Sequence, residues 1–445
     1  MDTPTAPVDT TTTKRVAGVV RSFGFYRNST FLTLLIGYAG YYLCRQNFSA
    51  AYPAMKDALH MDKATFGAIT SFGTLMYALG KFTTGALADT RGGRTIFLVG
   101  LIGVVVGSLV IGTGISTGIP FFFAAWGIVR LFQSMGWAGV VNVMARWFPK
   151  SQYGTAMGLM SVNYQFGGVV ATMFAGYLLE LKFGWQALFF LPALVLAGIG
   201  VVAYFTLTNC PQDVGHVLPS DSSTDVSAGS RHAADTTLSY LSRFRIVLGD
   251  RMFLLMCTMS FILTLLRECF NVWMPAYFSD MGAAPAMAAF KSAVFPLMGC
   301  IGTIFTGWYS DKYLQGRRGP IMATLMGVLV ILLMALGHLE LVAQVTGLER
   351  STAAVWLVAA TGFFLLGPYS LVGGVVALDF GGRRTAGTAA GLLDGIGYLG
   401  ATLAGWGVAE VVVKLGWSQA FTFMAGLTVL AIILCGFLWR VRPRE

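Results

Sequence analysis

The chain has 445 residues, of which 56% are hydrophobic and 11% are charged, and its formal net charge is +10. A soluble domain carries about 25% charged residues, so this composition excludes a protein whose surface faces mainly water. The positions of the basic residues, described below, also exclude nucleic-acid binding as the reason for the net charge.

Apolar stretches long enough to cross a bilayer follow one another along the chain. A spanning helix needs about 20 mostly apolar residues, whereas the strands of a membrane barrel would alternate over about 10 residues. The stretches have the first pattern, so we predict an all-α membrane protein with 12 transmembrane helices. Their expected ranges are 31–52, 66–88, 95–114, 120–143, 153–179, 186–208, 252–278, 285–309, 320–341, 353–378, 386–413 and 418–439.

Basic residues outside these spans are distributed unequally between the two faces of the membrane. If the amino terminus is cytoplasmic, 20 Lys and Arg residues lie on that face and six on the other. Because cytoplasmic loops carry the excess of Lys and Arg, we expect both termini in the cytoplasm of a multi-pass protein of the cell (inner) membrane. The positive charge then follows from topology, and no nucleic-acid partner is expected.

A polar segment divides six spans from six. Residues 209–250 are rich in Asp, Ser, Thr and Pro, which is typical of a soluble linker. We expect a monomer whose regions are an amino tail at 1–30, a six-helix half at 31–208, the linker at 209–250, a second half at 251–440 and a carboxyl tail at 441–445.

The two halves repeat one another in sequence. RQNFSAAYPAM, which begins at Arg45, aligns with RECFNVWMPAY, which begins at Arg267, at a constant offset of 222. GTAMGL at 154–159 and GTAAGL at 387–392 form another repeated pair. Such repeats imply two pseudo-symmetric halves that hold a substrate between them near the midplane of the membrane.

A loop motif occurs once in each half. The second span ends in GALADTRGGR and the eighth in GWYSDKYLQGRRG, and both resemble the G-x-x-x-D-x-x-G-R signature of the major facilitator superfamily. We expect the glycine to permit close helix approach and the aspartate to lie where basic residues can latch the halves together. The expected gating residues are Gly85, Asp89, Arg94, Gly307, Asp311 and Arg318.

Arg45 and Arg267 occupy repeat-related positions inside the first and seventh spans. An ionisable residue at membrane depth is energetically costly and by default functional. Two guanidinium groups that face one cavity call for a dianion, and a phosphate monoester carries about −1.5 to −2 charges. The alternative is an arginine paired with a buried acid, for which Glu268 is the candidate. Adjacent helical residues point about 100° apart, so we expect that Glu268 does not simply cover Arg267.

Two further cations lie inside predicted spans. Lys81 is roughly 12 Å from the helix end at Asp89, farther than a lysine comfortably snorkels. We therefore expect Lys81 to be a third charge that attracts phosphate, with snorkelling as the alternative. Arg130 could line the cavity or pair with an acid, and the sequence leaves both readings open.

Several segments resemble the organophosphate:phosphate antiporters, a family that includes bacterial glycerol-3-phosphate and hexose-phosphate transporters and animal sugar-phosphate exchangers. The resemblance implies that Arg45, Lys81 and Arg267 occupy phosphate-binding positions. It also extends the substrate-binding set to Tyr41, Tyr42, Gln133, Tyr164 and Asp394. Tyr164 stands where glycerol-3-phosphate transporters carry a histidine, and Asp394 resembles the acid in GLxDGIG of the animal group. The segments are LCRQNF (43–48), LGKFTTGALAD (79–89), QSMGW (133–137), LLRECFNVWMPAYF (265–278), GWYSDK (307–312), GPYSLVGGVVALD (367–379) and AGTAAGLLDGIGYLG (386–400).

These observations predict a secondary active transporter that exchanges a phosphorylated organic molecule for inorganic phosphate by alternating access. One alternative is a transporter-like membrane sensor of sugar phosphate. Another is a proton-coupled sugar or drug facilitator, which Arg130, Glu268 and Asp394 would suit. The histidines show no metal or nucleophile spacing, so we expect no enzyme, cofactor or metal site. The sequence does not choose among glycerol-3-phosphate, hexose phosphates, phosphoglycerate and related esters.

Overall fold

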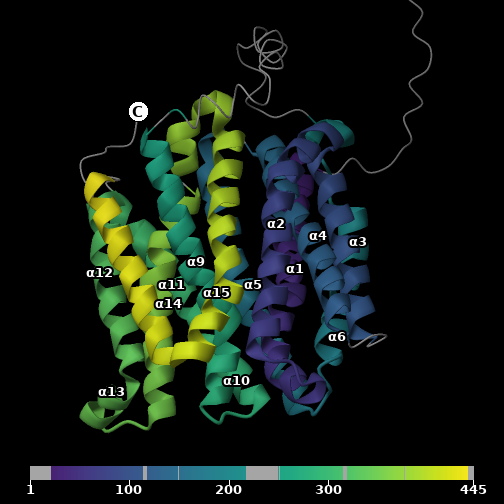
Figure 1. The fold of residues 1–445 in the computed structure, drawn as a ribbon. Helices are drawn as coiled ribbons and strands as arrows, with labels where there is room; N and C mark the ends of the chain where they lie inside the picture. Colours follow the sequence, from purple (N-terminus) through teal and green to yellow (C-terminus); the bar gives the residue numbers. More distant parts are fainter. Residues whose placement is uncertain are drawn as a thin grey trace, which may run out of the picture.

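The computed structural model describes residues 22–113, 118–148, 150–216, 249, 251–313, 318–374 and 376–438. Regular structure within these ranges is helical, and they contain no strand. Figure 1 shows the helices standing side by side in two groups, with α5 near the boundary between them. The prediction of an all-α protein is confirmed for the residues that the structure describes.

The first half contains six long helices. A short 3-10 helix, η1 (Pro211–Val214), follows the last of them. The helices are α1 (Phe23–Leu59), α2 (Lys63–Arg91), α3 (Gly93–Gly112), α4 (Ile119–Trp147), α5 (Lys150–Glu180) and α6 (Ala187–Thr206).

The second half differs from the expected spans at three places. The eighth expected span is divided at Ala293, the ninth ends at Gly337, and the eleventh and twelfth lie within one helical element. The elements are α9 (Arg251–Asp280), α10 (Pro285–Ser292), α11 (Val294–Tyr313), α12 (Arg318–Gly337), α13 (Leu339–Thr346), α14 (Arg350–Gly374) and α15 (Val376–Leu438).

The long element α15 reverses direction, as Figure 1 shows. Gly416 has a φ of +83°, a backbone conformation that glycine adopts without the steric cost of a Cβ atom. The chain therefore turns without a longer loop between the last two spans. We call the face where α15 ends the terminal face, and the face that carries α10 and α13 the opposite face.

Local sequence signals set several helix ends. The Ser22 side chain accepts a hydrogen bond from the backbone N–H of Phe25 at 3.3 Å, and the Asp62 side chain accepts one from Thr65 at 2.8 Å. Such caps satisfy backbone donors that the first turn of a helix leaves without partners. Gly92, at a φ of +84°, joins α2 directly to α3.

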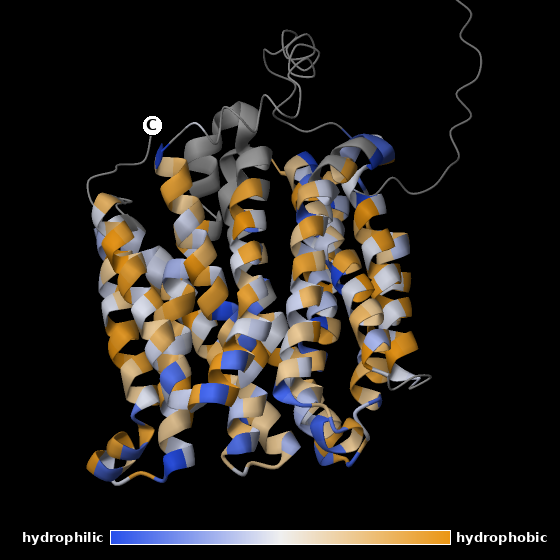
Figure 2. Cartoon of the chain, in the orientation of Figure 1, coloured by the Kyte–Doolittle hydropathy of each residue, from blue (hydrophilic) through white to orange (hydrophobic). Residues whose placement is uncertain are grey.

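Apolar residues predominate in the middle of the helix bundle, and hydrophilic residues are more frequent at its ends (Figure 2). Among the described residues, eight helical segments are long and apolar enough to cross a membrane, and one of them, 392–437, covers most of two expected spans. The long helices α1, α2 and α5 are not among the eight. These helices carry polar residues of the interior, which lowers their mean hydropathy.

The two halves pack closely toward the opposite face. A Cβ atom on Gly67 of α2 would lie 2.7 Å from the carbonyl oxygen of Gly405 in α15. Only glycine permits backbones to approach so closely. Beside this contact, Phe66 stacks on Tyr52 at 4.1 Å between ring centroids and meets Trp273 of the second half at 5.3 Å. These aromatic side chains form a layer across the interface between the halves, on the side toward the opposite face.

Candidate functional site

Arg45 of α1 and Arg267 of α9 meet at the interface between the halves. Nη2 of Arg45 and Nη2 of Arg267 both donate to the hydroxyl oxygen of Tyr398 in α15, at 3.1 and 2.8 Å. The two side chains are 9% and 6% exposed. The guanidinium groups that the sequence repeat places at related depths therefore share one acceptor.

Glu268 also lies between the two arginines. Its Oε1 accepts a hydrogen bond from Arg267 Nη2 at 2.6 Å and from Arg45 Nη2 at 3.2 Å. The expectation that Glu268 does not cover Arg267 is wrong. Adjacent Cβ atoms do diverge on a helix, but long Glu and Arg side chains have enough rotatable bonds for their ends to meet.

Arg267 keeps one donor available. Its Nη1 donates to the Tyr369 hydroxyl at 2.7 Å, while its Nε is buried and has no hydrogen-bond partner among the described residues. An unsatisfied buried donor costs about 1–3 kcal/mol. An anionic ligand that reaches this nitrogen would remove that cost.

Lys81 of α2 forms an ion pair with Asp394 of α15, 2.7 Å from Nζ to Oδ2. The Lys81 side chain is 7% exposed, and Nζ lies 5.1 Å from the Tyr77 ring centroid. The Tyr77 and Tyr398 rings are 4.5 Å apart, so Lys81 belongs to the same cluster as the arginines. Lys81 therefore does not snorkel toward the helix end.

Arg130 of α4 occupies a second layer behind Arg45. Its Nη1 donates to Gln133 Oε1 at 2.9 Å, and Gln133 Nε2 donates to the Cys44 carbonyl oxygen at 2.8 Å. The Arg130 guanidinium carbon lies 4.7 Å from the Tyr77 ring centroid. It makes no ion pair in the part of the chain that the structure describes. Gln133 thus fixes α4 against α1 beside Arg45.

The remaining residues of the predicted substrate-binding set differ in where they lie relative to the arginines. The Arg45 guanidinium carbon lies 5.4 Å from the Tyr42 ring centroid, and Tyr42 lines the cavity. Tyr41 instead donates its hydroxyl to the Phe97 carbonyl of α3 at 2.6 Å, away from the arginines. The Tyr164 side chain lies outside the described residues.

Among the residues that the structure describes, neither predicted loop motif links the two halves. Arg94 Nη2 donates to the Tyr204 carbonyl oxygen at 2.7 Å, which is a contact within the first half. Among the described residues, no atom lies within 4 Å of the position that a Cβ on Gly307 would take, so these residues show no close approach there. The side chains of the other four motif residues, Gly85, Asp89, Asp311 and Arg318, lie outside the described residues.

The arginines line a cavity between the halves. Two of the cations and one anion of the surrounding cluster line it, and the others lie beside it around Tyr77. The cluster has four cationic and two anionic side chains, so its formal charge is four minus two, or +2. The cations are Arg45, Lys81, Arg130 and Arg267, and the anions are Glu268 and Asp394.

Sequence reasoning missed the tyrosines that organise this cluster. Tyr77 stands four residues before Lys81, and Tyr398 four residues after Asp394. Residues four apart lie on the same face of a helix, so this spacing was the available signal. Tyr369 of α14 is far in sequence from every predicted site residue, so the same four-residue spacing could not identify it.

The chain is similar to known transport proteins over nearly its whole length. Residues 34–405 match the family model of the Major Facilitator Superfamily. A probable hexose phosphate transport protein of Chlamydia trachomatis is 27% identical over 435 residues, which cover 94% of this chain and 91% of the relative. The glycerol-3-phosphate transporter of Bacillus subtilis is 26% identical over 431 residues, covering 94% and 93%.

Another curated relative carries a different description. The membrane sensor protein UhpC of Escherichia coli is 27% identical over 434 residues, which cover 95% of this chain and 94% of the sensor. Among solved structures, the D-xylose-proton symporter gives a TM-score of 0.73 at 14% identity, covering 94% of this chain and 98% of that one. This structural likeness establishes the fold alone.

Proposed function

We propose that this chain, which belongs to the Major Facilitator Superfamily and within it to the organophosphate:phosphate antiporter family, exchanges a phosphorylated organic molecule for inorganic phosphate. The observation that carries the proposal is the cavity between the halves, where two buried guanidinium groups converge and the formal charge is +2. A phosphate group carries about −1.5 to −2 charges at neutral pH, which matches that excess.

Hydrogen-bonding capacity supports the same ligand. The free Nε of Arg267 can donate to one phosphate oxygen. Guanidinium groups bind phosphate in bidentate fashion, and charge-assisted hydrogen bonds of this kind are roughly twice as strong as neutral ones. The hydroxyl of Tyr398, which accepts from both arginines, occupies the position where a bridging phosphate oxygen would compete.

Exchange follows from the charges of the unloaded site. Glu268 and Asp394 neutralise part of the positive charge, but an excess of two remains when the cavity is empty. Closing both halves over uncompensated charges costs desolvation energy. A phosphate that binds residues of both halves removes this cost, so the ligand stabilises the occluded state selectively. The unloaded carrier should reorient slowly, and exchange by alternating access should be fast.

The relatives described as hexose phosphate and glycerol-3-phosphate transporters favour a phosphate ester as the organic passenger. We further propose that the protein lies in the inner membrane with both termini in the cytoplasm, on the basis of the 20 to six distribution of basic residues. The similarity to the sensor UhpC favours a second candidate, a membrane sensor of sugar phosphate.

Counterflow distinguishes these candidates. Proteoliposomes loaded with inorganic phosphate are offered labelled phosphate esters and their unphosphorylated parents. The proposal predicts rapid uptake of at least one ester and of none of the parents. A protein that binds an ester but takes up neither ester nor phosphate would be a sensor. Arg350→Lys is the control variant, because this arginine is 59% exposed and pairs with Glu340 far from the cavity.

A further inference from the structure

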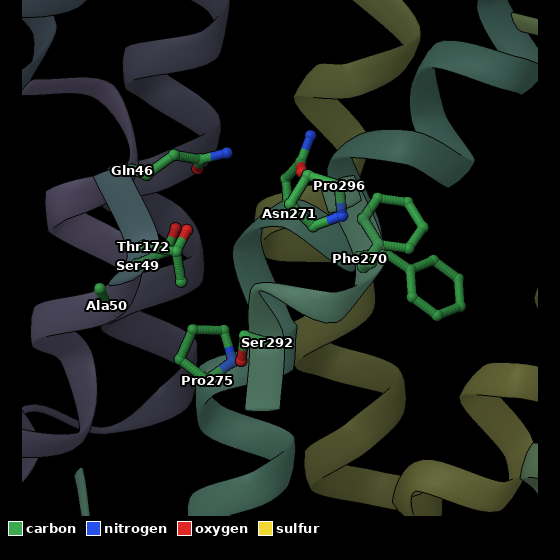
Figure 3. Close-up of a pocket in the computed structure, with 10 residues that line it drawn as sticks. Gln46, Ser49, Ala50, Thr172, Phe270, Asn271, Pro275, Ser292 and Pro296 are labelled. Carbon is green, nitrogen blue, oxygen red and sulfur yellow. The ribbon is translucent and has the colours of Figure 1, made fainter. Parts of the chain in front are cut away.

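A second cavity adjoins the arginine cavity. Gln46 of α1, Asn271 of α9 and Pro296 of α11 line both cavities, so the two are adjacent. Figure 3 shows the Gln46 side chain extending from the first half toward the second, where the Asn271 side chain points upward in the view. Gln46 directly follows Arg45, and Asn271 lies one helical turn after Arg267, so a ligand held by the arginines reaches this cavity.

The walls of the second cavity combine polar and apolar residues, and none of them is charged. Its hydrogen-bonding side chains are Gln46, Ser49, Thr172, Asn271 and Ser292. Thr172 and Ser292 donate their hydroxyl protons to carbonyl groups of their own helices, at 2.9 and 2.6 Å. The side chains of Gln46, Ser49 and Asn271 make no hydrogen bond to any described residue, so they can serve a ligand.

A buried acceptor in the wall of the arginine cavity is also unused. Gln165 of α5 is 3% exposed, and its Nε2 donates to the Thr303 hydroxyl oxygen at 2.7 Å. Thr303 donates its only hydroxyl proton to the Leu366 carbonyl oxygen, so Gln165 must present its nitrogen to Thr303. Gln165 Oε1 is left buried with no partner among the described residues. Such an acceptor needs a donor, which the dianion of a phosphate ester and a carboxylate do not supply but a sugar hydroxyl does.

We propose, on the basis of the proposed function, that these two cavities select a polyhydroxylated ester, a sugar phosphate, with Gln46 and Asn271 as specificity-determining residues. The phosphate binds Arg45 and Arg267, and the hydroxyl groups of the sugar bind the two amides and Gln165 Oε1. A phosphorylated carboxylate fits poorly, because its carboxylate would be desolvated among neutral groups without a cation. Glycerol-3-phosphate has fewer hydroxyl groups with which to form these hydrogen bonds.

The test compares affinities of the purified, reconstituted full chain. Half-saturation is measured for phosphate self-exchange, and inhibition of that exchange is measured for a hexose 6-phosphate, glycerol-3-phosphate and a phosphorylated carboxylate. The wild-type protein should bind them in that order of decreasing affinity. Gln46→Leu and Asn271→Leu should each weaken hexose-phosphate binding about tenfold, because a lost hydrogen bond and an unpaired hydroxyl together amount to about 1.4 kcal/mol. Phosphate half-saturation should stay within about twofold.

A control variant, Gln344→Leu, removes an exposed amide on α13 and should change neither affinity. Equal losses for phosphate and hexose phosphate in Gln46→Leu and Asn271→Leu would contradict the proposal, as would no loss for either ligand. A phosphorylated carboxylate that inhibits the wild-type protein best would contradict it too. If the wild-type protein shows no phosphate self-exchange at all, the proposed function itself fails, and the sugar-phosphate site fails with it.

Discussion

Glu268 contacts Arg45 across the interface between the two halves, with Oε1 3.2 Å from Nη2, although the residues are 223 positions apart in the chain. The same oxygen lies 2.6 Å from Arg267 Nη2. The unloaded cavity is therefore bridged by an internal anion. A phosphate that enters must replace or share these contacts, which makes Glu268 a competitor of the ligand.

Replacing either central arginine by lysine tests the guanidinium geometry. Arg45→Lys and Arg267→Lys keep the charge but lose the planar fork, since an ammonium group cannot donate in parallel to two oxygens. We expect phosphate self-exchange to fall at least about tenfold in each variant, while Arg350→Lys remains active. Near-normal exchange in Arg45→Lys or Arg267→Lys would remove both residues from the phosphate site.

Glu268→Gln tests the internal anion. The amide oxygen can still accept a hydrogen bond, but the formal charge of the cavity rises by one. We expect the half-saturation concentration of phosphate to fall roughly tenfold, because the ligand no longer competes with a carboxylate. The maximal exchange rate should fall as phosphate release slows. Glu340→Gln, at a 68% exposed position of α13, is the control. Weaker phosphate binding in Glu268→Gln would instead indicate that the carboxylate orients the arginines.

The Lys81 and Asp394 pair can be tested with a double-mutant cycle. Lys81→Met leaves a partly buried carboxylate without its cation, and Asp394→Asn leaves a buried ammonium group without its anion. Each single substitution should lower the free energy of unfolding in detergent by about 1–3 kcal/mol, and the double variant should recover most of that loss. We expect the double variant to remain impaired in phosphate exchange, because Lys81 also attracts phosphate. Full recovery of exchange would make the pair purely structural.

Much of this site was predictable because its two arginines occupy equivalent positions in the two sequence repeats. Arg45 and Arg267 stand out as charges at related positions in apolar spans, and Lys81 lies too deep to reach the helix end. The contact of Glu268 with Arg45 was not predictable, because it depends on how closely α1 and α9 pack. The helices were likewise predicted from hydropathy, while the reversal within α15 depends on the single backbone conformation of Gly416.

A contact on the opposite face predicts how the halves separate. Lys63 at the start of α2 lies 2.5 Å from Asp280 at the end of α9, and Trp417 Nε1 donates to the same carboxylate at 2.8 Å. If alternating access opens this face, linking Lys63→Cys to Asp280→Cys with a short bifunctional thiol reagent should stop phosphate exchange. Cleaving the link should restore the exchange.

The matched control links Glu340→Cys to Arg350→Cys, a pair that lies within the second half at 2.7 Å in the native chain. Cys210 and Cys300 are replaced by serine in both proteins, because these two native cysteines are not fully buried. Exchange that persists in the protein linked between residues 63 and 280 would mean that the opposite face need not open there.

The central claim is that a phosphate dianion compensates a positively charged cavity and so permits the halves to reorient. At an effective dielectric constant of about 20, two unit charges about 7 Å apart repel by roughly 2 kcal/mol, and occlusion adds desolvation to that. The most direct measurement is uptake of labelled phosphate into proteoliposomes with and without internal phosphate, at equal pH on both sides and again with an imposed pH gradient. We predict rapid uptake only when internal phosphate is present, whatever the pH gradient. Rapid accumulation into phosphate-free vesicles, driven by the pH gradient and indifferent to internal phosphate, would contradict the exchange mechanism and favour a proton-coupled facilitator.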